Sequence, residues 1–186
     1  MGLYGLLGTL AAAAELGSDP PRIATLDIPG PAPFVALARD VVDIAASLDP
    51  SVAANAGLFE DALRVPQYGR DDLRKLEARL DRDLRRLARL PWRSWDVHTQ
   101  VDFRWVYAVA ETSRRSIVVE RLYTRMPGQW LEPVGNDLIA LASYAPDRPE
   151  LQDRVLAEIP AMVAEMRSQC TEPTRRDVET GLRLTE

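Results

Sequence analysis

The only histidine is the first residue of this chain that could do chemistry. His98 is followed four residues later by Asp102, so on a helix the two side chains share a face and can form a hydrogen-bonded pair. A carboxylate that orients an imidazole is half of a general base or of a metal site. Zinc needs three or four ligands, and the chain offers no second histidine and one distant cysteine, Cys170. We therefore interpret the pair as a surface or structural pair, and we predict no catalytic and no metal-binding residue.

A cluster of acidic and arginine side chains is the second candidate. Its members are Glu111, Arg114, Arg115, Glu120, Arg121 and Arg125. Glu111 and Arg115 are four residues apart, as are Arg121 and Arg125, which puts each pair on one face of a helix. Two neighbouring guanidinium groups could bind a carboxylate or phosphate, or they could pair with acids of adjacent helices. We take Glu111, Arg115, Arg121 and Arg125 as a possible ligand or partner surface.

The four tryptophans are gathered in one stretch between Trp92 and Trp130. They could form a platform on which a ligand stacks. Large aromatic side chains more often fill the gaps where helices meet, with the indole N–H bonded to a partner. We therefore predict that the tryptophans pack in the core. The sequence contains no glycine-rich phosphate loop, no nucleophile elbow and no calcium-binding loop.

The charge of the chain bears on its partners. The formal net charge of −5 argues against a general nucleic-acid binder, which needs excess positive charge to displace phosphate counterions. Residues 70–93 contain nine basic and five acidic residues, and we interpret this small excess as a solvated helix face. Within it, Asp71 and Lys75, and likewise Asp81 and Arg85, are spaced for i,i+4 ion pairs.

Apolar residues recur at three- and four-residue steps along most of the chain, which is typical of helices. We expect helices over residues 34–48, 50–63, 71–90, 94–126, 130–144 and 149–170, the fifth starting at 130 or 133. Pro160 should kink the last of them. No alternation typical of strands is present, and 186 residues suit one domain. The sequence therefore predicts an all-α fold, an irregular multi-helix bundle of about six or seven helices.

Residues 1–33 differ from the rest in composition. An apolar run over residues 3–14 ends in alanines, and residues 17–33, rich in proline and glycine, look like a linker. The run lacks a preceding Lys or Arg and is too short to span a bilayer, so we predict no stable membrane span. A degenerate secretory signal, an amphipathic first helix and the remnant of a longer signal all remain open. A secreted or periplasmic location is slightly favoured over a cytoplasmic one.

The last residues begin a new helical pattern that has no closing signal. Thr174 opens it, Val178 and Leu182 continue it, and the sequence stops at Glu186 without a cap. We therefore expect residues 34–186 to be a helical domain that forms the N-terminal part of a longer protein.

Three runs resemble the N-terminal half of the bacterial domain-of-unknown-function family 885. They are LRKLEARLDRDLRRLARLPWRSWDVHTQVDFRWVYAVAE, ERLYTRMPGQWLEPVGNDLIAL and LAEIPAMVAEMRSQCTEPT. They carry a leucine-rich helix, a tryptophan- and arginine-containing helix start, an Arg125–Pro127 turn, an Ile159–Pro160 step and a Thr171–Pro173 turn. These features concern packing and turns, and the resemblance extends from about residue 34 to the end.

The resemblance implies a helical, zinc-metallopeptidase-like and carboxypeptidase-like protein. The zinc motif of that family, an HExxH-type stretch, lies downstream of the matched region, and this chain contains none. No metal or catalytic residue carries over, so zinc is expected only in a further, downstream half. The resemblance implies a non-catalytic N-terminal scaffold that forms one wall of a cleft for a peptide substrate. The alternative is a self-standing helical interaction protein that binds a partner or an acidic ligand through its arginine-rich helix face.

Overall fold

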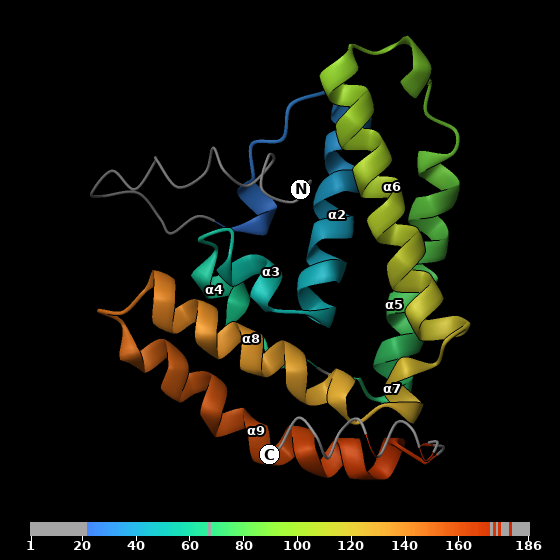
Figure 1. Ribbon diagram of the computed structural model, residues 1–186. Coiled ribbons are helices and arrows are strands. Elements are labelled where there is room, and N and C mark those ends of the chain that lie inside the picture. Colours follow the sequence, from blue (N-terminus) through green and yellow to red (C-terminus); the bar gives the residue numbers. More distant parts are fainter. Residues whose placement is uncertain (1–21, 67, 172, 174, 176–178, 180–186) are drawn as a thin grey trace.

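The structure, a computed structural model, describes residues 22–66, 68–171, 173, 175 and 179 (Figure 1). Its helices are η2 (Ile23–Thr25), α2 (Ala32–Leu48), α3 (Ser51–Ala54), α4 (Phe59–Ala62), α5 (Arg70–Leu87), η3 (Trp92–Ser94), α6 (Val97–Val118), α7 (Leu122–Arg125), α8 (Gly128–Tyr144) and α9 (Pro149–Gln169). No strand occurs in these described ranges, which confirms the predicted all-α, irregular multi-helix bundle. The predicted apolar run and most of the final helical pattern lie outside the described residues.

The long helices form two groups that meet at a corner. Helices α2, α5 and α6 stand side by side, and each contacts the other two. Helices α8 and α9 lie across one end of this group, and α3 packs on α8 (Figure 1). Helix α7 connects α6 to α8 at the corner. The start of α5 comes close to α9 at this corner, where Gly69 lies next to the Glu165 side chain.

Helix α5 shows how the sequence pattern orients a helix in the bundle. Leu76, Leu80, Leu84 and Leu87 recur at three- and four-residue steps and are buried against the other helices. Most of the charged residues between them face outward, as predicted for an amphipathic helix, but Asp83 is buried with the leucines. The helix ends at Leu87, a turn earlier than expected, because the following residues form tight turns ahead of Pro91.

The predicted long helix over residues 94–126 is wrong at both ends. Helix α6 begins at Val97, where the Asp96 carboxylate accepts the backbone N–H of Thr99 at 3.1 Å and caps the first turn. It ends at Val118, and Arg121 then takes a left-handed backbone with φ 51°. Three successive β-branched residues, at 117–119, weaken the helix there because their side chains lose rotamer freedom in a helix.

The predicted helix over residues 50–63 is also wrong, because the chain forms two short helices instead. Helix α3 ends at Ala54 and α4 begins at Phe59. Gly57 lies between them with φ 74°, a conformation that glycine adopts without steric strain. The glycine thus redirects the chain and lets α3 lie against α8.

An aromatic cluster fills the corner between the two groups of helices. Tyr68 and Trp130 are fully buried and meet edge to face, with ring centroids 4.9 Å apart. The Tyr68 ring also lies 4.3 Å from that of Tyr123, and the Trp130 indole N–H donates to the Tyr123 carbonyl at 2.8 Å. The predicted core packing is confirmed for Trp130, whereas Trp92, Trp95 and Trp105 are half-buried against the core.

Two further expectations concern the ends of the described region. Residues 22–31, which look like a linker in the sequence, place Ile23, Leu26 and Ile28 in the core. Arg39 of α2 donates to the Leu26 carbonyl at 2.8 Å and connects this stretch to the bundle.

Pro160 lies inside α9, and Figure 1 shows the predicted change of direction near the middle of that helix.

Candidate binding groove

An open groove lies between α5 and α9. Its larger part encloses about 630 Å³ and an adjoining part about 210 Å³. Both parts are lined by Val65, Asp72 and Glu158, so they form one continuous depression, which we call the α5–α9 groove. Volumes of this size are typical of ligand sites in proteins.

The floor of the α5–α9 groove is apolar. It is formed by Leu63, Val65, Leu76, Trp130 and Met162. Trp130 and Met162 also belong to the buried core, so the floor is rigidly supported by the corner cluster. Leu63 and Val65 are partly exposed in the groove, and apolar surface of this kind favours ligands that carry apolar side chains.

The two walls of the groove carry opposite charge. Arg64, Lys75 and Arg79 line one side, and the side chains of Glu158 and Glu165 line the α9 side. Asp72 also lies in the groove, where its carboxylate is paired with the Lys75 ammonium group at 2.8 Å. This arrangement is complementary to a ligand that carries both charges along with apolar groups, which is the chemistry of a polypeptide segment.

A partly exposed ion-pair network holds the basic wall in place. The Asp43 carboxylate accepts from Arg64 Nη1 at 2.5 Å and from Arg79 Nη2 at 2.8 Å. Burial opposes the ionisation of Asp43, but the hydrogen bonds from the two guanidinium groups outweigh it and lower its pKa. Asp61 extends the network, because it accepts Arg64 Nη2 at 2.9 Å and the backbone N–H of Ile23 at 2.7 Å. The two arginines are therefore preorganised at the wall.

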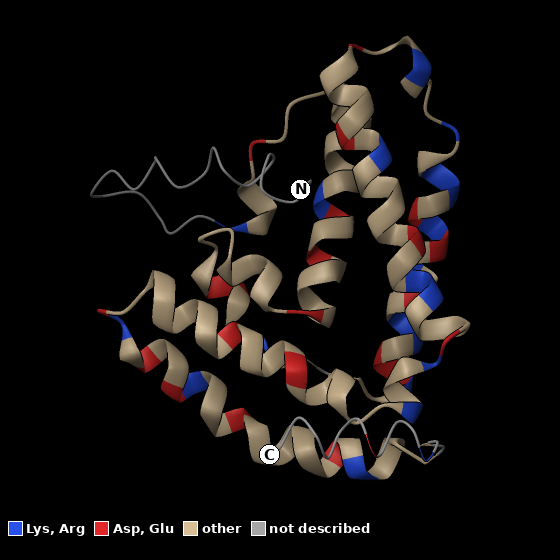
Figure 2. Cartoon of the chain, in the orientation of Figure 1, with Lys and Arg blue, Asp and Glu red and all other residues tan. Residues whose placement is uncertain are grey.

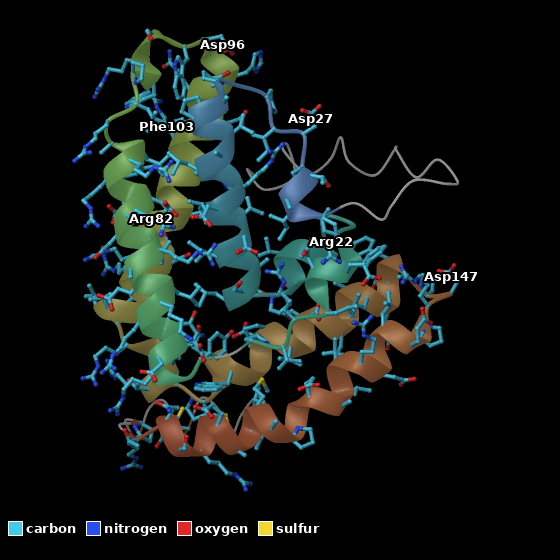
Figure 3. All side chains as sticks on the ribbon, turned by 180° about the vertical axis from the view of Figure 1, so that it is seen from behind. Arg22, Asp27, Arg82, Asp96, Phe103 and Asp147 are labelled. Atoms are coloured by element: carbon cyan, nitrogen blue, oxygen red, sulfur yellow. The ribbon has the colours of Figure 1, made fainter. Side chains whose placement is uncertain are left out.

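A carboxyl pair lies behind this network, between α2 and α5. Asp83 is fully buried, and burial together with the adjacent Asp40 carboxylate raises its pKa to about 6. Arg79 and Arg82 both contact Asp40, the latter at 3.0 Å, and the pKa of Asp40 is lowered (Figure 3 labels Arg82 on α5). Asp83 Oδ2 accepts no hydrogen bond from the described residues, which fits a proton that Asp83 shares with Asp40. Because it is buried, Asp83 cannot touch a ligand in the groove.

A second buried carboxyl lies on α8. Asp137 is 1% exposed, and its Oδ1 has no hydrogen-bond partner in the part of the chain that the structure describes. Burial, with a smaller effect from the Asp49 carboxylate, raises the pKa of Asp137 to about 7. The nearby Tyr68 hydroxyl donates to the Leu48 carbonyl, and burial raises its pKa as well. Asp137 is enclosed by the core, so it affects stability rather than chemistry at the surface.

The predicted arginine surface is distributed over two elements. Glu111 and Arg115 lie on α6, and Arg115 Nε donates to the Glu120 carboxylate at 2.8 Å. Arg121 and Arg125 come after the end of α6. Arg121 is the N-cap of α7 and has a left-handed backbone, and Arg125 is the last residue of α7. The four side chains therefore do not share one continuous helix, contrary to the expectation from the spacing. Whether they bind an acidic ligand stays a prediction.

The histidine and aspartate on α6 do not form a metal site with described neighbours. His98 is exposed, whereas Asp102 lines a narrow pocket of about 30 Å³ together with Phe34 and Trp105. Burial raises the pKa of Asp102, and the nearby His98 opposes this rise. The pocket has room for about one water molecule. Among the described residues, no three His, Cys, Asp or Glu side chains are grouped to hold a metal ion.

Sequence reasoning missed the α5–α9 groove, although it found the helices that form it. The expected i,i+4 pairs are not the observed ones: Lys75 pairs with Asp72, and Asp81 pairs with Arg114 of α6. Arg64 and Glu158 come from segments far apart in the sequence. Pro66 and Gly69 are turn-forming residues, and they separate Arg64 from the part of the basic wall that lies on α5.

Comparison of the chain with protein families, with curated proteins and with solved structures gives no match. The resemblance to family 885 therefore stays a prediction. No helix in the described part of the chain combines the length and the apolar composition needed to cross a bilayer.

Proposed function

We propose that this chain is a non-catalytic helical scaffold that binds an extended polypeptide segment in the α5–α9 groove. The observation that carries the proposal is the apolar floor between walls of opposite charge. Backbone and mixed side chains of a peptide can satisfy both walls while its apolar side chains cover Leu63 and Val65. Because Arg64 and Arg79 are already held in place by their ion pairs, they lose less side-chain entropy when a ligand binds.

The proposal includes the role that the family resemblance implies. In a metallopeptidase-like protein of the family 885 type, this chain would be the N-terminal scaffold, and the groove would be one wall of the substrate cleft. Zinc and the catalytic groups would belong to a downstream half. In the alternative, a self-standing interaction protein, the same groove would hold a segment of a partner. An acidic ligand on the arginine surface receives less support, because Arg121 and Arg125 do not continue the helix that carries Glu111 and Arg115.

A substitution that fills the groove provides the test. Ala161 is exposed on α9 and lines the 210 Å³ part of the groove, so Ala161→Trp should obstruct it. Peptides selected from a displayed random library against the wild-type chain should bind Ala161→Trp at least about tenfold more weakly, since the indole displaces buried ligand groups. Binding is measured by fluorescence anisotropy with the labelled peptide.

Ala164→Trp is the matched control. Ala164 is exposed on the same helix but does not line the groove, so this variant should bind the selected peptides like the wild type. If both variants bind equally, or if the library yields no peptide that the wild-type chain binds, the groove is not a polypeptide site.

A further inference from the structure

The tip of the α5–α6 hairpin, residues 85–104, is strongly basic. It carries five arginines, Arg85, Arg86, Arg89, Arg93 and Arg104, against two aspartates, Asp96 and Asp102. The chain as a whole has a formal net charge of −5, so the tip differs in sign from the rest of the molecule. Figure 2 shows this blue region on the end of α5 and on the turn that follows it.

The two aspartates of the hairpin tip pair with none of its arginines, and among the described residues only Arg86 has an acidic partner, Asp83 at 3.8 Å. Asp96 is occupied as the cap of α6, where it accepts both the backbone N–H and the hydroxyl of Thr99. Asp102 lines the narrow apolar pocket with Phe34 and Trp105. Within the described chain, Arg89 and Arg93 form no ion pair, in contrast to the paired Arg64 and Arg79 of the groove.

The same tip exposes aliphatic side chains. Val97 is 72% exposed and Val101 is 58% exposed, so both present aliphatic surface to the solvent. Arg104 follows at the i+7 position from Val97, so one face of α6 presents two valines and an arginine. Apolar groups next to arginines are typical of surfaces that enter the headgroup region of a bilayer.

We propose that the hairpin tip docks on a lipid surface that carries anionic headgroups. The arginines would bind the lipid phosphates, and Val97 and Val101 would enter the boundary between headgroups and acyl chains. This surface is separate from the α5–α9 groove, so the inference does not depend on the proposed polypeptide binding. Docking by the tip would leave the groove free.

The aromatic residues of the tip favour lipid over nucleic acid. Proteins that bind single strands stack bases on open aromatic rings. The Trp92 ring is stacked on Phe103, with centroids 5.1 Å apart and planes 13° apart, and the guanidinium carbons of Arg93 and Arg104 lie 4.6 and 5.3 Å from its centroid. A covered ring offers no stacking platform, whereas exposed valines gain from contact with lipid.

Flotation with vesicles tests the inference on the full chain. The wild-type chain should bind vesicles of equal parts phosphatidylglycerol and phosphatidylcholine, and salt should weaken the binding. Arg89→Gln with Arg93→Gln should lower the partition coefficient by roughly 25-fold, or about fivefold for each arginine. Val97→Asp should also lower it, without changing the melting curve, because Val97 is exposed.

Arg70→Gln with Arg167→Gln is the matched control, since it makes the same change of net charge at exposed sites outside the tip. All variants are full chains, so any contribution of residues 1–21 is common to them. The inference is overturned if the tip and control variants bind the anionic vesicles equally, or if the wild type binds them no better than pure phosphatidylcholine. The wild-type chain could also bind duplex DNA or polyglutamate as tightly as it binds the anionic vesicles. If the same variants lose that binding, general charge attraction explains the result and the inference is overturned.

Discussion

Replacing Asp137 with Asn should raise the free energy of unfolding by about 2–4 kcal/mol at about pH 8. The carboxyl is 1% exposed, and Oδ1 finds no partner among the described residues, so its ionised form is poorly solvated in the folded chain. Its pKa is raised from 3.8 to about 7. The folded chain therefore binds this proton more tightly than the unfolded chain does. The amide has nearly the same shape but carries no charge.

The sign of the pH dependence follows from this difference. Below the unfolded pKa of 3.8 the carboxyl is protonated in both states, and ionisation imposes no penalty on the fold. Between that pH and the folded pKa of about 7 the penalty grows, and above it the penalty is complete. The stability gain of Asp137→Asn should therefore be small near pH 4 and largest near pH 8. Asp83, whose pKa is also raised, gives stability a pH dependence of the same sign. It is present in both the wild type and the Asp137→Asn variant, so its effect cancels from their difference.

Urea denaturation across this pH range is the measurement, and Asp153→Asn is the control. Asp153 is exposed on α9, so its replacement should change stability little at any pH. A gain for Asp137→Asn that stays constant with pH, or a loss that is greatest at high pH, would contradict the assignment of a strained buried carboxylate.

Trp130→Ala should lower the free energy of unfolding by about 3–5 kcal/mol. The indole is fully buried and packs edge-on against Tyr68, and its N–H bond to the Tyr123 carbonyl joins α8 to the turn at α7. Truncation opens a cavity at the corner and removes that bond. The loss should also disturb the groove, because Trp130 forms part of its floor.

Trp105→Ala is the matched comparison, since Trp105 is only half-buried. Its loss of stability, measured by the same denaturation, should be clearly smaller. Trp130→Phe should fall between, because it keeps the ring packing and loses the indole hydrogen bond. Equal losses for Trp130→Ala and Trp105→Ala would show that the corner cluster is not the main connection between the two groups of helices.

The helices could be predicted because their information is local. Leucines at three- and four-residue steps define the buried face of α5, and proline and glycine mark several of the breaks. The failures are also local in origin. Helices end near Gly57 and near the β-branched residues at 117–119, although the apolar periodicity continues through both places. Periodicity alone therefore does not reveal these helix ends.

The groove could not be predicted, because it depends on which helix faces meet. Arg79 and Glu158 both lie on outward faces of amphipathic helices, where the sequence indicates only solvation. The buried Asp137 was missed for a related reason. One aspartate in an apolar helix gives no sign of whether its side chain turns outward or is covered by another element.

The central claim is that the α5–α9 groove binds polypeptide, and NMR mapping on the full chain tests it most directly. A peptide selected from the random library is titrated into the isotope-labelled chain, and backbone amide shifts are followed. We expect the largest shifts at residues 63–79 and 158–165, which surround the groove. Shifts concentrated at residues 111–125, or at the hairpin tip, would contradict the claim and place polypeptide binding on another surface.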